Sequence, residues 1–173
     1  MPSLQSTDFE LFGVPAQFAQ DRAALDAKWK DLQREAHPDK FAAQGAAAQR
    51  AAMQWSVRIN EAYQRLRNPL KRASYLCELN GAPIQAENNT AMPTEFLMQQ
   101  MEWREALDDA KTIEKMNQIS LEANKYGCEK LSKIEHFIDV NQDFSAAALQ
   151  VRSLMFIERF ASEVEGRIDQ LQQ

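Results

Sequence analysis

Two amphipathic helical patterns on either side of Pro38 constrain the fold of this chain more than any other feature. Proline has no N–H to donate and disfavours the α region for the residue before it, so a helix has to end by His37. The apolar positions recur every three or four residues on both sides, at Leu25, Trp29, Leu32 and Ala36 and again at Ala52, Trp55, Ile59, Ala62, Tyr63 and Leu66. The spacing predicts helices over 21–36 and 47–67, joined by a loop over 40–46. Their apolar stripes can pack antiparallel, which places His37-Pro38-Asp39 at the solvent-facing tip of a helical hairpin.

Capping signals place two shorter helices around the hairpin. Thr7 and Glu10 form a capping box, and Gly13 ends the short helix that it opens. Asn68 and Pro69 suit the N-cap and first position of a helix that ends at Asn80-Gly81. The first 81 residues therefore read as one helical module.

The remaining sequence predicts a second helical module. Residues 82–93 contain two prolines and two asparagines without helical periodicity, which indicates a linker. Three long helical patterns follow, near 94–110, 112–138 and 144–171, with short connections. Such a pattern is typical of an antiparallel three-helix bundle over 94–173. No strand pattern is present, so the predicted fold class is all-α.

Charge and composition exclude several function classes. The net charge is −5, with 11 Lys/Arg against 9 Asp/Glu in residues 1–81 and 9 against 16 in residues 82–173. A surface so acidic disfavours nucleic-acid binding, because phosphates are repelled. No apolar run approaches the length of a membrane span, and the first residues resemble neither a signal nor a transit peptide. We therefore expect no nucleic-acid or membrane partner, and a cytoplasmic location.

Metal and cofactor chemistry has little support in the sequence. Cys77 and Cys128 do not form a CxxC pair, and His37 and His136 are the only histidines. A structural zinc site needs about four such ligands at short spacings. We expect no metal and no cofactor. Both cysteines are expected to be buried thiols, and His136 an ordinary helix residue.

The segment 96–109 carries two apolar stripes on one helix. Phe96, Trp103 and Leu107 form the first. The second consists of Leu97, Met98 and Met101, with Glu102, Glu105 and Asp109 along its border. Either both stripes are core, or the second is an exposed binding face, since unpaired carboxylates are rarely buried. The periodicity leaves both interpretations open.

A small basic strip leads toward the hairpin tip. Lys30 and Arg34 lie four residues apart on one flank of the helix, and Asp31 and Glu35 lie on the other. The spacing alone favours a solvated face with local ion pairs. A docking surface next to His37 is the alternative.

The sequence resembles the J domain and, over nearly its whole length, the HscB-type J-proteins of iron–sulfur cluster assembly. The resemblance rests on Trp29, Leu32 and His37-Pro38-Asp39-Lys40, on Ile59-Asn60, Ala62-Tyr63, Leu66, Pro69, Arg72-Ala73 and Tyr75-Leu76, and on Phe96-Leu97-Met98, Glu102, Arg104-Glu105, Leu107-Asp108, Arg152 and Phe156. It implies a J domain in 1–81 followed by a C-terminal bundle. Met101 and Asp109 differ in type from the family's leucine and glutamate but keep their character.

The resemblance implies a co-chaperone that is not itself an enzyme. His37, Pro38 and Asp39 would stimulate ATP hydrolysis by an HscA-type, DnaK-class chaperone, and Lys30, Arg34 and Lys40 would form the docking surface. An IscU-type scaffold protein would bind Leu97, Met98, Met101, Glu102, Glu105, Asp109 and Phe156. The co-chaperone would deliver that scaffold to the ATPase.

Two other functions are alternatives to this one. A general J-protein for unfolded clients is the nearest alternative, although such proteins often carry Gly/Phe-rich or zinc modules that this sequence lacks. A hydrolase using His37 and Asp39 would need a nucleophile or a metal and shielding from water, and a hairpin tip supplies neither.

Overall fold

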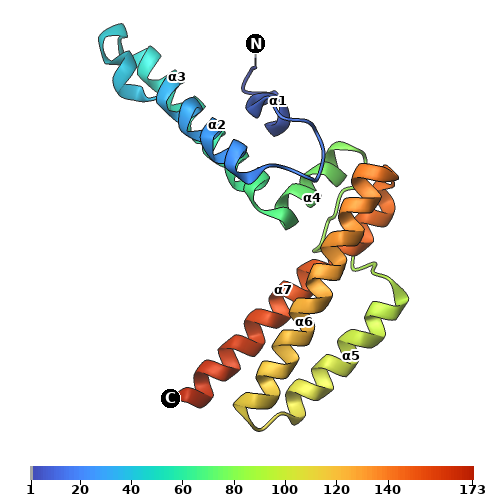
Figure 1. The fold of residues 1–173 in the computed structure, drawn as a ribbon. Helices are drawn as coiled ribbons and strands as arrows, with labels where there is room; N and C mark the ends of the chain where they lie inside the picture. The colour runs from blue at the N-terminus through green and yellow to red at the C-terminus, as the bar shows by residue number, and fades with distance from the viewer. Residues whose placement is uncertain (1) are drawn as a thin grey trace. The chain divides into compact units, whose positions relative to one another are not determined.

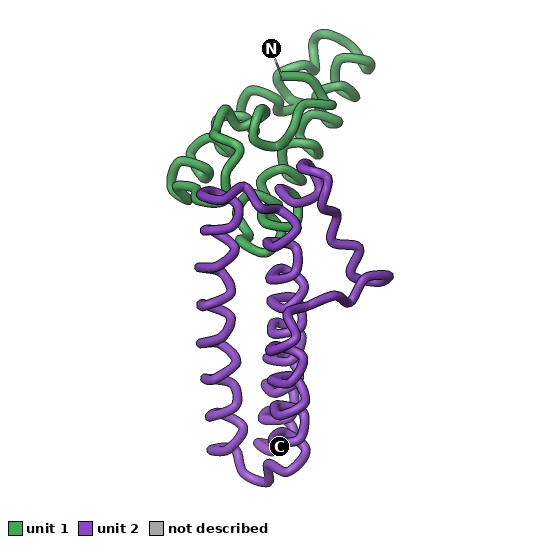
Figure 2. Tube along the Cα trace, turned by 90° about the vertical axis from the view of Figure 1, so that its right-hand side faces the viewer, with its two compact units in different colours: residues 1–75 green, residues 76–173 purple. Residues whose placement is uncertain are grey.

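The computed structural model describes residues 2–173 and confirms an all-α fold, with no strand among them. The helices are α1 (Asp8–Phe12), α2 (Arg22–Glu35), α3 (Ala46–Arg67), α4 (Pro69–Leu79), α5 (Thr94–Asp109), α6 (Ile113–Glu135) and α7 (Phe144–Gln172) (Figure 1). A 3₁₀ segment, η1 (Pro38–Gln44), follows α2, and a π-helical turn, η2 (His136–Val140), follows α6. The chain divides into two compact units, residues 1–75 and 76–173, which Figure 2 colours green and purple. The boundary falls within α4.

The predicted capping box and helix-ending glycines are confirmed, and Asp21 caps a further helix. The Thr7 side chain accepts the Glu10 N–H, and the Glu10 side chain accepts the Thr7 N–H, so the capping box is complete. Asp21 accepts the N–H groups of Ala23 and Ala24 at the start of α2. Gly13 and Gly81 have φ of 64° and 80°, the left-handed conformation that glycine adopts without steric cost and that suits a helix end.

The core of unit 1 is the antiparallel pair α2 and α3. Ile59 and Leu66 of α3 are buried, and Leu25 is the fully buried member of the α2 stripe. The Asn60 side-chain oxygen accepts hydrogen bonds from Trp29 Nε1 (2.9 Å) and Gln33 Nε2 (2.8 Å), both on α2. This polar seam fixes the register of the two helices, because a shift of one turn would leave the indole N–H without its acceptor.

Helix α1 is held to α3 by a buried carboxylate. Asp8 has no exposed surface, and its carboxylate lies 2.8 Å from Arg58 Nη1 and 2.6 Å from Arg65 Nε. The Asp8 backbone N–H donates to the Tyr75 hydroxyl at 3.0 Å. A charge removed from water needs such partners, and here the two arginines supply them.

Unit 2 is built on the pair α6 and α7, with α5 alongside (Figure 1). The buried stripe of α6 includes Ala123 and Gly127, and Gly127 faces Leu154 and Ile157 of α7 with room for a Cβ in ordinary contact. Trp103 of α5 stacks on Phe160 of α7 at 5.6 Å between ring centroids and meets Tyr126 of α6 edge-on at 5.1 Å. The remaining buried members of this core cluster are Phe96, Leu107, Ala110, Met116, Ile119, Ile157 and Val164.

Three expectations need correction. Cys128 is exposed, because it lies off the buried stripe of α6, whereas Cys77 is buried as expected. The segment expected to be a loop over 40–46 is mostly 3₁₀ helix, since Pro38 has the φ that a helical first position requires. The second bundle helix ends in the π-helical turn η2 rather than as regular helix.

Candidate functional site

The tip of the α2–α3 hairpin displays His37 and Asp39 to solvent. His37 leaves the helical region with φ −63° and ψ 128°, and Pro38 starts η1. The His37 and Asp39 side chains are 59% and 91% exposed. His37 Nδ1 accepts the Asp39 backbone N–H at 3.2 Å, and this hydrogen bond holds the turn. The turn is therefore rigid and accessible.

The basic residues near this turn are also accessible. Lys30, Arg34 and Lys40 are exposed. Arg34 forms an ion pair with Asp31 at 3.4 Å, with both side chains more than half exposed. An exposed pair of this kind contributes at most about 1 kcal/mol, so a partner can displace it. Arg34 thus makes the local ion pair that the spacing favours, and Lys30 and Lys40 are exposed, while the docking role of this flank stays a prediction.

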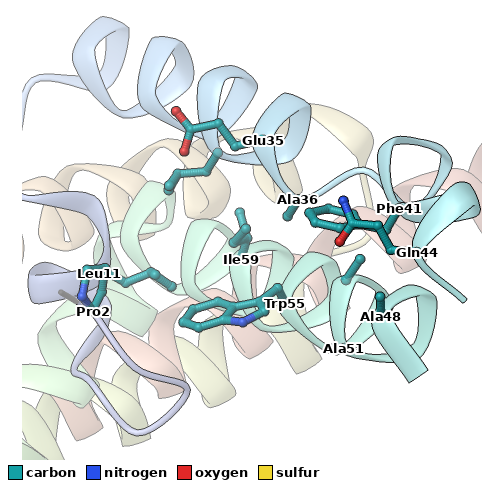
Figure 3. A pocket seen from close by; sticks show the side chains of 12 residues that line it. Pro2, Leu11, Glu35, Ala36, Phe41, Gln44, Ala48, Ala51, Trp55 and Ile59 are labelled. Atoms are coloured by element: carbon teal, nitrogen blue, oxygen red, sulfur yellow. The ribbon is translucent and has the colours of Figure 1, made fainter. Parts of the chain in front are cut away.

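An apolar groove of about 490 Å³ opens beside the hairpin tip (Figure 3). Leu32 and Ala36 of α2, Phe41 of η1 and Trp55 of α3 lie along it. Ala48, Ala51 and Ala52 line the same groove, and their small side chains leave it open. This explains why the stripe of α2 is only partly buried toward the tip.

Helix α5 presents a second apolar stripe to solvent. Leu97, Met98 and Met101 are 44%, 64% and 73% exposed, whereas the first stripe of Phe96, Trp103 and Leu107 is buried. Glu102, Glu105 and Asp109 are exposed beside it. Of the two interpretations that the periodicity left open, the structure therefore selects the exposed apolar strip with an acidic margin.

Phe156 of α7 lies half-buried against the first turn of α5. Its ring meets Phe96 edge-on at 5.8 Å and stacks on Phe160 at 6.0 Å. The Arg104 guanidinium lies 5.6 Å from the Phe156 ring centroid and 5.5 Å from that of Phe160, and it pairs with Glu163 of α7. Arg104 of α5 therefore lies over two aromatic rings of α7 and holds Phe156 in place by cation–π attraction.

Lys130 of α6 packs against α5, a contact that the sequence analysis did not predict. It is buried, and its Nζ lies 5.0 Å from the Phe96 ring centroid. Burial is the main cause that lowers the Lys130 pKa. The residue lies at the spacing of the buried α6 stripe, which was the one available signal, but a lysine there reads as a solvent residue. The contact of Arg104 with the aromatic rings was not predicted either, because Arg104 lies among the other charged residues of 102–109.

The fold and the two surfaces together define a class of all-helical proteins. In this class, a J-like hairpin with an exposed His-Pro-Asp turn is followed by a three-helix bundle. A family model described as the HSCB C-terminal oligomerisation domain matches residues 92–165. The co-chaperone protein HscB homologues of Burkholderia multivorans and Burkholderia cenocepacia are 50% and 51% identical over 175 residues, which cover 99% of each chain. On these matches, the chain belongs to the HscB co-chaperone family.

Solved structures agree with this membership. Chaperone HscB from Vibrio cholerae matches with a TM-score of 0.80 at 34% identity and covers 96% of this chain and 99% of its own. Human co-chaperone protein HscB matches with a TM-score of 0.83 at 27% identity and covers 99% of this chain and 84% of its own. Within residues 2–173, no helix has both the length and the apolar character that crossing a bilayer requires.

Proposed function

We propose that this chain is a co-chaperone of iron–sulfur cluster assembly that binds an IscU-type scaffold protein, delivers it to an HscA-type, DnaK-class ATPase and stimulates ATP hydrolysis there. The observation that carries the proposal is the exposed strip of Leu97, Met98 and Met101 on α5, in a chain of the HscB family whose hairpin tip is also exposed. The chemistry belongs to the ATPase, and this chain acts as adaptor and activator.

The hairpin tip supplies the proposed contact with the ATPase. His37, Pro38 and Asp39 are held on a stiff turn, and Lys30, Arg34 and Lys40 add exposed positive charge. Basic side chains of this kind increase the rate and orientation of docking more than the affinity. Stimulation follows when the tip binds the hydrolysis-competent conformation of the ATPase more tightly than the other.

The α5 face supplies the proposed contact with the scaffold. Methionine side chains adapt their shape to a partner. Covering an exposed apolar strip removes it from water, which favours binding. The acidic residues Glu102, Glu105 and Asp109 form a polar rim that favours a partner with basic residues nearby. Phe156 adds an aromatic anchor, positioned by Arg104.

The two surfaces can be tested separately with His37→Gln. The variant should bind the scaffold with unchanged affinity and lose stimulation of the ATPase, because the substitution changes only the tip. Steady-state ATP turnover by the chaperone and a scaffold titration measure the two effects. Retained stimulation would refute the role of the turn.

A matched pair of variants tests the α5 face. Met101→Ala removes an exposed side chain, so it should weaken scaffold binding by roughly 5–30-fold, as for a central apolar anchor worth 1–2 kcal/mol, and leave thermal stability unchanged. Phe156→Ala should weaken binding and also lower stability, since Phe156 packs on Phe96 and Phe160. Unchanged affinity in both variants contradicts the proposed face. Capture of many unfolded clients instead of one scaffold would favour a general J-protein.

The functional division of the chain belongs to the same proposal. We assign ATPase docking to residues 1–81 and scaffold binding to 94–173, with 82–93 between them. A cytoplasmic location is part of the proposal as well, and cell fractionation checks it.

A further inference from the structure

Arg152 is a buried cation of α7 whose hydrogen-bond acceptors all lie in the segment between α4 and α5. The residue is 7% exposed. Nε donates to the carbonyl of Ile84 at 3.1 Å, Nη1 to that of Ala91 at 3.3 Å and Nη2 to that of Pro83 at 3.4 Å. The guanidinium therefore uses three of its nitrogens to hold one stretch of irregular backbone, residues 83–91, which we call the strap.

The strap has few other fixed points. Ile84 is buried, and a turn follows in which the N–H groups of Asn88 and Asn89 donate to the Gln85 carbonyl. Gln85 has φ 46°, an uncommon conformation for a residue with a side chain. The Arg152 contacts join the two ends of the strap, at Pro83–Ile84 and at Ala91. Figure 1 shows the segment passing beside the bundle on its way from α4 to α5.

The strap leads directly into the proposed scaffold-binding helix. Met92 is partly buried against the core, and Pro93 caps α5 without a side-chain hydrogen bond. The Pro93 carbonyl accepts the N–H groups of Phe96 (3.0 Å) and Leu97 (3.2 Å). The position of Leu97 thus depends on the backbone at Pro93, which lies two residues after Ala91. α5 has no side-chain N-cap hydrogen bond, and the Arg152 contact at Ala91 constrains the backbone that enters the helix without satisfying the free N–H groups of its first turn.

We propose that Arg152 is a positioning residue for scaffold recognition: by clamping both ends of the strap, it fixes the first turn of α5 and thereby presents Leu97 and Met98 to the partner in a preorganised form. The inference rests on the proposed function of the α5 face. A preorganised surface binds more tightly because its ordering cost is already met in the free protein. Without the clamp, the first turn has to be ordered at each binding event.

Hydrogen exchange measured by mass spectrometry tests the clamp without any partner. Arg152→Met keeps the apolar stem and removes all three donors, and Arg159→Met is the matched control at an exposed position of the same helix. In Arg152→Met, peptides covering 83–97 should exchange at least about tenfold faster, as expected when hydrogen bonds from a charged donor are lost. Peptides of α6 and α7 should be unchanged. Unchanged exchange in 83–97, or equal acceleration throughout unit 2, overturns the proposal.

Binding measurements test the consequence for recognition. Arg152→Met should weaken binding to an IscU-type scaffold by roughly tenfold, and Arg152→Lys, which keeps the charge but not the fork, by less. In double-mutant cycles, Arg152→Met should couple with Leu97→Ala at the start of α5 and be additive with Asp109→Ala at its end. A general loss of stability would not produce that difference. Should Arg152→Met fail to fold, Arg152→Lys carries both measurements.

The outcomes separate this inference from the proposed function. If Met101→Ala weakens scaffold binding but Arg152→Met does not, the α5 face stands and the positioning role is refuted. If neither variant changes the affinity, the proposed scaffold face itself fails. Stimulation of the ATPase measured without scaffold should be equal in all variants, since none of them alters the hairpin tip.

Discussion

Gly127 offers a direct test of how closely α6 and α7 approach. It lies within α6, where glycine costs about 1 kcal/mol relative to alanine because it leaves the unfolded chain more freedom. A Cβ added there would lie 3.6 Å from Ile157 Cγ2 and 3.7 Å from Leu154 Cδ1, which is ordinary van der Waals contact. Gly127→Ala should therefore stabilise unit 2 by about 1 kcal/mol from helix propensity, with a further contribution from the buried methyl group.

The assay is thermal unfolding by calorimetry, and Gly166→Ala is the control. Gly166 lies within α7 with nothing within 4 Å of an added Cβ, so it gains the propensity term alone. A gain of 1 kcal/mol raises the midpoint by about 4–8 °C for a unit of roughly 100 residues. Gly127→Ala should match or exceed Gly166→Ala. If Gly127→Ala lowers the midpoint while Gly166→Ala raises it, the two helix backbones lie closer than the structure places them.

Three further predictions concern buried polar groups. Asp8→Asn should destabilise unit 1 by about 3–5 kcal/mol in urea unfolding, since two arginines lose their buried anion. With a thiol reagent near pH 8, Cys128 should react and Cys77 should not, because burial raises the pKa of Cys77 to about 11; equal reactivity contradicts the packing around α4. The hydrogen bond to Asp26 raises the pKa of Tyr63, so its stabilisation is present below pH 10 and lost as Tyr63 ionises at higher pH. Tyr63→Phe should remove that alkaline loss from a pH series of unfolding midpoints.

The helices were predictable because their signals are local. A capping side chain such as Thr7 and a helix-ending glycine such as Gly81 act within four residues of the backbone that they satisfy. The sequence left two possibilities for Met101, buried or exposed, because both stripes of α5 have helical spacing. Packing decided between them: Trp103 of the first stripe stacks on Phe160 of α7, and no other helix of unit 2 covers Met101.

Contacts between distant residues were not predictable from such patterns. Asp8 meets Arg58 and Arg65, and Arg152 meets Ile84, across separations of 50 residues or more. Nothing in the local sequence distinguishes these charges from solvated ones. The predicted burial of Cys128 was wrong for the opposite reason: the prediction followed the residue type and not the position of Cys128 on the helix. The functional roles of the site residues stay predictions, which the variants above test.

The carboxylates beside the strip of Leu97, Met98 and Met101 have a consequence for the free protein. When two copies approach through this face, Glu102, Glu105 and Asp109 of one meet the same residues of the other. Like charges at close range repel, and salt screens that repulsion, with a Debye length of about 10 Å at 0.1 M. Electrostatic repulsion therefore disfavours self-association of the free protein through this apolar face, and high salt weakens that repulsion.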